Sequence, residues 1–101
     1  MEIKDKNEFQ NIINSDYALV DFFATWCGPC KMLSPIIENV ANSCDNIKVA
    51  KVDVDKHEDL ARTYGVMSIP TLILFKNGQV VSTKVGFVPE PLLNEWINDN
   101  R

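Results

Sequence analysis

The chain has 101 residues, and a length of this order favours a single domain with one hydrophobic core. Hydrophobic residues make up 46% of the sequence and charged residues 24%, which excludes the disordered, fibrous and membrane-spanning classes. The formal net charge of −4 argues against a general nucleic-acid binder, because such proteins usually present a basic face. We therefore expect one domain over residues 1–101, with no nucleic-acid and no membrane partner.

The first ten residues, MEIKDKNEFQ, are rich in charge and lack the apolar run of a secretory signal peptide. We therefore expect a cytoplasmic protein. Cytoplasmic thiols are kept reduced, so a close pair of cysteines in such a protein is more often catalytic or metal-binding than structural.

The predicted elements begin with a short strand at residues 2–4. A helix follows, because Asp5 and Glu8 have the spacing of a capping box at a helix start. The run ALVDFFA at residues 18–24 is almost continuously apolar, which indicates a strand buried on both faces.

A second helix is predicted from about Cys27. Its apolar positions keep one face, which Cys44 continues, and Pro35 inside it is expected to kink it. A strand rich in β-branched residues follows at residues 47–55.

The second half of the chain starts with a short helix to about Tyr64, for which residues 55–58 (Asp-x-x-Glu) are the expected cap. Two strands follow at residues 71–75 and 79–85. They are joined through Asn77-Gly78, a dipeptide that accepts positive φ at both positions and favours a tight hairpin.

The last helix is predicted to begin near residues 89–91. Its four large apolar side chains fall on one stripe: Leu92, Leu93, Trp96 and Ile97. The element order β-α-β-α-β-α-β-β-α predicts an α/β fold, with a mixed central sheet of about five strands and about four helices on both faces. Since this sheet would cover every apolar stripe of the helices, we expect a monomer.

Two of the three cysteines, Cys27 and Cys30, lie in the motif WCGPCK with Gly28 and Pro29 between them. Cys27 stands where the buried strand ends and the helix begins, so Cys30 falls one turn later on the same side of the helix. The unpaired N–H groups and the dipole of a first helical turn favour a thiolate at Cys27. Such a pair lies within reach of a disulfide, which suits a reaction centre.

Two other interpretations of the pair are a structural disulfide and half of a zinc site. A disulfide that closes so small a ring constrains the unfolded chain little. Zinc prefers four ligands, and the only other candidates are Cys44, about four turns further along the helix, and His57 in a charged first turn. We expect Cys44 to be a small core residue, His57 to be solvated, and no metal to be bound.

Asp21 interrupts the apolar run that leads to Cys27. Burial of a carboxylate is costly and raises its pKa, so Asp21 is a candidate proton acceptor behind the cysteines. A position at a sheet edge, facing solvent, is the alternative. Lys51 shares a strand face with Ile47 and Val49, which predicts partial burial, but a lysine whose amine extends into solvent fits the same pattern.

The chain resembles the thioredoxin family over nearly its whole length, through four stretches: VDFFATWCGPCKMLSP (20–35), VAKVDVD (49–55), YGVMSIPTLILFKNGQVV (64–81) and KVG (84–86). A tryptophan before the cysteine pair and Gly-Pro within it are similar to thioredoxins rather than to glutaredoxins or disulfide isomerases. The resemblance implies the thioredoxin fold and a protein-disulfide reductase that works by dithiol-disulfide exchange.

The resemblance also implies a role for each polar residue of the site. Cys27 would be the exposed nucleophile and Cys30 the less exposed resolving thiol, and the two would form the redox disulfide Cys27–Cys30. Asp21 would accept the proton of Cys30, and Lys51 would modulate Asp21.

A docking surface for substrate is implied by the same resemblance. The Ile69–Pro70 bond would be cis and face the cysteines, which leaves the backbone of Ile69 free to pair with an extended substrate segment. The full surface would contain Trp26, Gly28, Pro29, Ile69, Pro70 and Gly86. Without the resemblance, Trp26 fits a core position as well.

Two positions depart from the common pattern of the family. Phe23 stands where many members have tryptophan, and Met67-Ser68 stands where members vary, often with glycine or a basic residue. We expect these changes to affect partner preference or reduction potential and to leave the chemistry intact.

The four glycines form no nucleotide-binding fingerprint, so no cofactor is expected and electrons must come from another protein. The resemblance implies thioredoxin reductase as that donor, and ribonucleotide reductase, peroxiredoxins and methionine sulfoxide reductases as substrates. One alternative function is a redox-independent binding module that uses the same surface. Another is a disulfide isomerase or oxidase, which a more oxidising reduction potential would favour.

Overall fold

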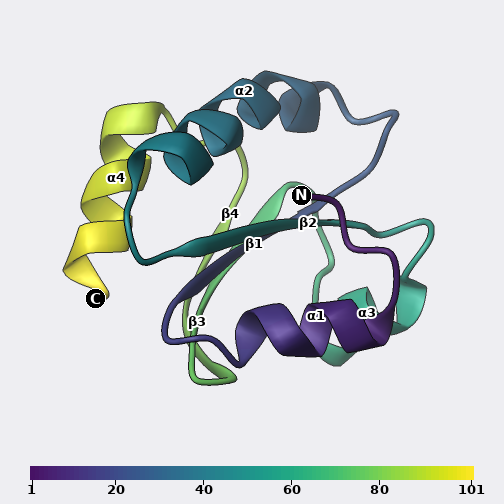
Figure 1. Ribbon diagram of the computed structural model, residues 1–101. Helices are drawn as coiled ribbons and strands as arrows, with labels where there is room; N and C mark the ends of the chain where they lie inside the picture. Colours follow the sequence, from purple (N-terminus) through teal and green to yellow (C-terminus); the bar gives the residue numbers. More distant parts are fainter.

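A central sheet separates two layers of helices in the computed structural model, which describes residues 1–101 (Figure 1). The elements follow in the order α1 (Lys6–Ile13), β1 (Ala18–Phe23), α2 (Gly28–Ser43), β2 (Lys48–Asp53), α3 (Glu58–Thr63), β3 (Thr71–Lys76), β4 (Gln79–Val85) and α4 (Glu90–Asp99). None of these helices is long and apolar enough to cross a membrane.

The sheet is mixed, with strand order β2-β1-β3-β4. β1 and β2 run parallel, whereas β3 is antiparallel to both β1 and β4. The central strand β1 is buried along its whole length, as its apolar sequence predicts. β4 lies at an edge and is largely exposed.

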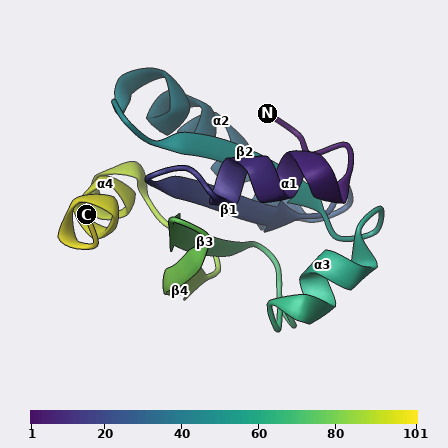
Figure 2. The same ribbon diagram turned by 60° about the horizontal axis from the view of Figure 1, so that its bottom comes forward.

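Alternate side chains of the strands supply two separate cores. Val20 and Phe22 of β1 pack with α1 and α3 on one face, whereas Leu19 packs with α2 and α4 on the other. Figure 1 and the turned view in Figure 2 show α1 on one side of the sheet and α2 on the opposite side. The mixed sheet with helices on both faces confirms the predicted fold class.

The hairpin between β3 and β4 also confirms its prediction. Asn77 and Gly78 both have positive φ, 50° and 84°, the combination that a tight hairpin of this type requires. At the first helix, the Asp5 side chain accepts a hydrogen bond from the Glu8 N–H at 2.9 Å, so the predicted cap is present.

The expected first strand is reduced to an isolated bridge. Glu2 pairs with Lys51 of β2, and the Ile3 N–H donates a 2.8 Å hydrogen bond to the Lys51 carbonyl. The sheet therefore has four strands, not about five. The segment is too short to continue the ladder, because α1 begins at Lys6.

Three further expectations are wrong in detail. His57, not Asp55, is the N-cap of α3, and no side chain caps that helix. Cys44 is the C-cap of α2 and only half-buried; it packs against the core between α2, α4 and the sheet without being enclosed in it, so the expected core position holds only in part. Leu92 is 54% exposed and lies off the buried stripe of α4.

Candidate active site

The two cysteines of the motif form a disulfide at the start of α2. Cys27 is the N-cap, and its Sγ accepts a hydrogen bond from the Cys30 N–H at 3.2 Å. The Cα atoms of the two residues lie 5.3 Å apart, as one helical turn allows. Gly28 and Pro29 occupy the first helical positions, where proline loses no intrahelical hydrogen bond.

Both cysteines are buried in this oxidised form, with Cys27 5% and Cys30 3% exposed. The expectation of an exposed Cys27 is therefore wrong for this state. Cys30 is, as expected, the less exposed of the two cysteines. The physical reason is that the pair packs in a small apolar cluster with Phe23, Ala24 and the flanking Ile69.

Asp21 is fully buried in the middle of β1 and does not reach a sheet edge. Neither carboxylate oxygen has a hydrogen-bond partner. Burial raises the pKa of this carboxyl to about 6, and the Lys51 charge opposes that shift only in part. The solvent-facing alternative for Asp21 is therefore excluded.

Lys51 is the partner of Asp21 in the register between β2 and β1. Its ammonium nonetheless makes no hydrogen bond to that carboxylate. Its Nζ donates a 2.8 Å hydrogen bond to Ser34 Oγ on α2 and lies 4.6 Å from the centre of the Phe23 ring. Lys51 is half-buried, as its position in the strand predicts.

A cavity of about 200 Å³ lies beside these groups. Cys30, Ser34 and Lys51 line it from α2 and β2, with Phe23 and Lys31 also in its wall. Cys30, Ser34 and Lys51 thus border the same space.

Across from the disulfide, the Ile69–Pro70 bond is cis, as the resemblance implies. The Ile69 carbonyl oxygen lies 4.0 Å from Cys27 Sγ. Neither the N–H nor the carbonyl of Ile69 forms a backbone hydrogen bond within the chain. Pro70 is itself buried, and its carbonyl accepts a 2.8 Å hydrogen bond from the N–H of Gly86.

Trp26 stands at the rim of this site and is 69% exposed, which excludes the core position for this side chain. Its indole N–H donates a 2.9 Å hydrogen bond to Asp55 Oδ2. A shallow hollow of about 200 Å³ adjoins it, lined by Val54, Val66, Met67, Ser68 and Ile69 as well as Trp26. Met67 is 95% exposed and lines this hollow with Trp26 and Ile69, so one of the two family departures adjoins the implied docking surface.

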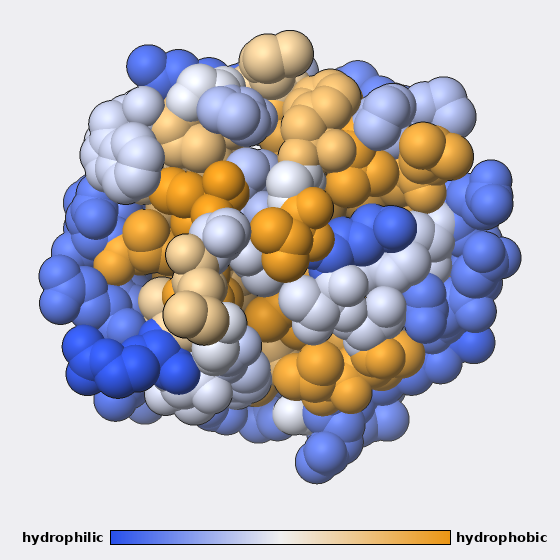
Figure 3. All heavy atoms as spheres, turned by 180° about the vertical axis from the view of Figure 1, so that it is seen from behind, coloured by the Kyte–Doolittle hydropathy of each residue, from blue (hydrophilic) through white to orange (hydrophobic).

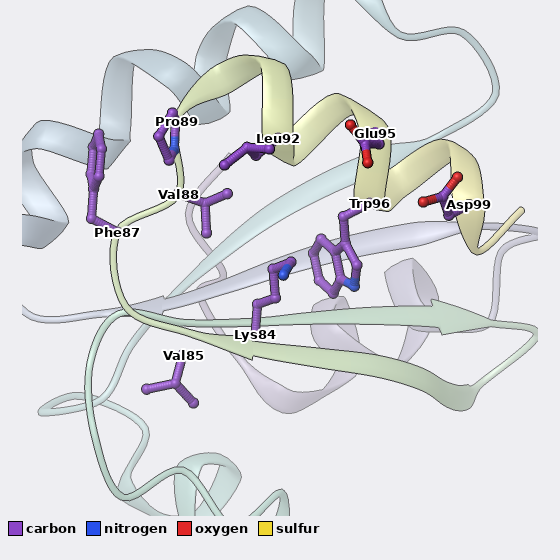
Figure 4. A pocket seen from close by; sticks show the side chains of 9 residues that line it. All are labelled: Lys84, Val85, Phe87, Val88, Pro89, Leu92, Glu95, Trp96 and Asp99. Carbon is purple, nitrogen blue, oxygen red and sulfur yellow. The ribbon is translucent and has the colours of Figure 1, made fainter.

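A second groove lies between β4 and α4, without either cysteine in its wall (Figure 4). Its volume is about 350 Å³, and its apolar wall includes Phe87, Leu92 and Trp96. Lys84 reaches over the Trp96 ring at 5.8 Å from its centre. Figure 3 shows that apolar patches on the face turned away in Figure 1 are interrupted by hydrophilic side chains.

The structure brings together no group of three or more His, Cys, Asp or Glu side chains that could hold a metal ion. Cys44 is far along the chain from the pair, and its Sγ lies 3.9 Å from Asn94 Oδ1. His57 is half-buried, not solvated as expected, because its Nε2 lies 3.2 Å from the Ile3 carbonyl oxygen.

Two residues of the site were missed from the sequence, Ser34 and Asp55. Ser34 lies one turn beyond Cys30 on α2, so its helical spacing to the motif was a usable signal. Asp55 carried no such signal, because its partner Trp26 is 29 residues away in the chain.

The comparisons with known proteins agree with this geometry. The family model named Thioredoxin matches residues 1–99. A thioredoxin of Bacillus subtilis is 51% identical over 81 residues, which cover 79% of this chain and 78% of the relative. The solved structure of a single-residue mutant of a thioredoxin from Halobacterium salinarum has a TM-score of 0.93 and 39% identity, over 99% of this chain and 88% of that one.

One further similar structure comes from work on the thiol resolving mechanism in yeast mitochondrial 1-Cys peroxiredoxin via glutathione/thioredoxin systems. Its matched chain is 33% identical with a TM-score of 0.87, over 98% of this chain and 93% of that chain. All three similarities extend over the segment that contains the disulfide and the cis bond.

Proposed function

The chain belongs to the thioredoxin family, and from that premise we propose that it is a protein-disulfide reductase in which Cys27 attacks and Cys30 resolves. It is a thiol-disulfide oxidoreductase, with the Cys27–Cys30 disulfide as its redox centre. The observation that carries the proposal is the position of this disulfide at the N-terminus of α2, with buried Asp21 on the strand that leads into it.

In the first step, the Cys27 thiolate of the reduced protein attacks one sulfur of a substrate disulfide. The substrate S–S bond breaks, its leaving sulfur takes up a proton, and a mixed disulfide joins Cys27 to the substrate. The first turn of α2 favours this attack, because its free N–H groups and dipole stabilise a thiolate at the N-cap.

In the second step, Cys30 loses its proton to Asp21 and attacks Cys27 Sγ. The mixed disulfide breaks, the substrate leaves as a thiolate that is then protonated, and the Cys27–Cys30 bond forms. Two electrons have moved from this protein to the substrate. A raised pKa of about 6 places Asp21 between an ordinary carboxyl and a thiol, which suits it to accept this proton near neutral pH.

Substrate docks on the surface around Cys27 and the Ile69 backbone. The unpaired Ile69 N–H and carbonyl provide one donor and one acceptor for an extended segment. Trp26, Gly28 and Pro29 are exposed beside the disulfide, and Gly86 is held next to Pro70 by its hydrogen bond. Buried Pro70 supports this surface from below.

The electron donor that we propose is thioredoxin reductase. The proposed substrates are proteins with reactive disulfides, such as peroxiredoxin, ribonucleotide reductase and methionine sulfoxide reductase. One similar structure was solved in work on a peroxiredoxin resolved via glutathione/thioredoxin systems, which supports the first of these substrates. We further propose a single domain over residues 1–101 that acts as a monomer, because the sheet is covered on both faces by its own helices. We also propose that it acts in the cytoplasm, where thiols are kept reduced.

The direct test is the reduction of insulin by dithiothreitol, followed as turbidity. The protein is expected to accelerate it, and an unchanged rate would reject the proposed function. In a second experiment, Cys30→Ser is expected to accumulate mixed disulfides through Cys27 when mixed with oxidised substrate proteins. Trapping through Cys30 in a Cys27→Ser variant, with none in Cys30→Ser, would reverse the assigned order of attack.

Two measurements distinguish the alternative functions from the proposed one. A redox-independent binding module predicts that the double variant Cys27→Ser/Cys30→Ser keeps full function in the cell. An oxidase or isomerase predicts an oxidising equilibrium with glutathione, whereas the proposed reductase predicts that the Cys27–Cys30 disulfide is harder to reduce than that of glutathione.

A further inference from the structure

The Lys51 ammonium has three neighbours that together define its position. It donates a 2.8 Å hydrogen bond to Ser34 Oγ, it lies 4.6 Å from the centre of the Phe23 ring, and it reaches the cavity that Cys30 also lines. A lysine amine on a four-carbon chain normally moves freely and prefers water. Here a hydroxyl on α2 and an aromatic face on β1 hold it in one place.

The charge of the same ammonium lowers the pKa of Asp21 and so opposes the effect of burial. The two residues are Cα partners across β1 and β2, yet both oxygens of Asp21 lack a hydrogen-bond partner. The attraction between them therefore acts through space, without a direct contact. In a poorly solvated interior, an attraction of this kind depends strongly on the distance between the charges.

Ser34 is the only polar partner that fixes this distance. It belongs to α2, the helix that also holds both sulfurs, so the hydroxyl links the position of the helix to that of the Lys51 charge. We propose that Ser34 is a positioning residue of the redox site, whose hydroxyl anchors the Lys51 ammonium and thereby sets how readily Asp21 takes up and releases a proton. This inference rests on the proposed role of Asp21 as the proton acceptor for Cys30.

Other charged or titratable groups also lie on this side of the sheet. α2 and its two caps contribute Cys27, Cys30, Lys31, the exposed Glu38 and Cys44, of which only Cys30 and Lys31 line the cavity. β2 adds the buried Asp53, two residues beyond Lys51 on the same strand face, whose Oδ1 accepts a hydrogen bond from the Asp55 N–H. The buried Tyr17 belongs to the core on this face. β3 contributes the apolar Leu72 opposite Asp21, and β4 places Lys84 opposite Leu72 in the same row. α4 adds only apolar and aromatic side chains to the core on this face.

Lys84 and Lys31 do not replace Lys51 in this arrangement. Lys84 lies 5.8 Å from the centre of the Trp96 ring, in the groove between β4 and α4, and Lys31 is exposed. With the disulfide closed, neither cysteine titrates. The titration of Asp21 in the oxidised protein thus reports mainly its burial and the position of the Lys51 charge.

The test is a carbon NMR titration of the Asp21 carboxyl in the oxidised protein. Ser34→Ala removes the anchor without disturbing the helix, since alanine has the highest helix propensity. The released ammonium is expected to move toward the solvent side of the cavity, away from Asp21. This raises the pH midpoint of the Asp21 titration, called the Asp21 midpoint below, by on the order of half a pH unit. Ser34→Thr keeps a hydroxyl and is expected to retain the wild-type midpoint.

Two matched variants separate positioning from packing. Ser43→Ala removes another hydroxyl of α2, one that donates to the Asn39 carbonyl at the far end of the helix, and it is expected to leave the Asp21 midpoint unchanged. Lys51→Met raises the midpoint by at least as much as Ser34→Ala. In the Lys51→Met background, Ser34→Ala is expected to have no further effect, because there is no charge left to position.

The proposal would be overturned if Ser34→Ala left the Asp21 midpoint unchanged or lowered it. A shift of equal size in the Lys51→Met background would also overturn it, because the serine would then act through packing. The titration needs no turnover, so its failure is distinct from that of the proposed function. If wild-type protein fails to reduce insulin, the function is rejected, whereas an unmoved Asp21 midpoint rejects only the role of Ser34.

Discussion

The indole N–H of Trp26 donates a hydrogen bond to Asp55 Oδ2 over 2.9 Å, and this contact joins the residue before the disulfide to the segment after β2. The Asp55 N–H in turn donates to Asp53 Oδ1 at 2.9 Å, which holds that segment in a turn. Trp26 is thus fixed on the surface although most of its ring is exposed. An ordered aromatic ring at the rim costs less entropy on substrate docking than a mobile one.

Asp55→Ala is therefore expected to lower kcat/KM for a disulfide-containing protein substrate by roughly threefold to tenfold, the size of one lost hydrogen bond. The effect should fall mainly on KM, because the sulfur chemistry is untouched. The measurement is steady-state reduction of a protein substrate. Asp59→Ala, which removes an exposed carboxylate on α3 that pairs with Lys6, serves as the control. Equal effects of the two variants would contradict a specific role for Asp55.

Asp21 should make the protein less stable as pH rises. Its pKa is raised from 3.8 to about 6 in the folded state, so between these values the folded protein binds more protons than the unfolded chain. Stability from this group is present below pH 3.8 and is lost as pH rises through about 6.

Asp21→Asn removes this titration. The free energy of unfolding of the variant, relative to wild type, is expected to rise by roughly 2–3 kcal/mol between pH 4 and pH 7.5. Urea unfolding of the oxidised proteins at the two pH values measures it. The same variant should slow the resolution of the mixed disulfide at neutral pH. A stability difference that is the same at both pH values would show that Asp21 has an ordinary pKa.

Gly86 has a φ of 97°, a conformation in which a side chain is strained, and its N–H is bonded to the Pro70 carbonyl. Gly86→Ala is expected to lower the free energy of unfolding by about 1–2 kcal/mol through the backbone alone, since an added Cβ would meet no atom within 4 Å. Gly28→Ala is the matched control, because it also meets nothing but has no positive φ. Urea unfolding should show no loss for Gly28→Ala. A loss as large as that of Gly86→Ala would rule out the backbone explanation.

Cys44 is half-buried at the end of α2 and takes no part in the proposed exchange. Cys44→Ser is expected to keep the wild-type rate of insulin reduction and to change the free energy of unfolding by less than about 1 kcal/mol, since serine fits the same space. Cys27→Ser, in contrast, should abolish the reduction. A Cys44→Ser protein that has lost its activity would assign this third thiol to the reaction.

Local sequence patterns predicted most of the fold. The apolar run of β1, the capping residue Asp5 and the hairpin residues Asn77-Gly78 each act within a few neighbours, so their structural effect is readable from the chain. The start of α2 at the cysteine pair is also determined by neighbouring residues. The cap predicted at Asp55 is wrong for a non-local reason, because that carboxylate accepts a hydrogen bond from Trp26, 29 residues away in the chain, and caps no helix N–H.

The sequence by itself determined that two cysteines meet at a helix start, one turn apart, and that a carboxylate lies in the strand before them. Only the tertiary structure decided what surrounds them. It buried Asp21 without a partner, brought the Ile69 carbonyl to 4.0 Å from Cys27 Sγ, and joined Lys51 to Ser34. The physical reason is distance along the chain. Each of these features depends on residues of different elements, which come together only when α2 packs on the sheet. The conformational preferences of neighbouring residues do not determine them.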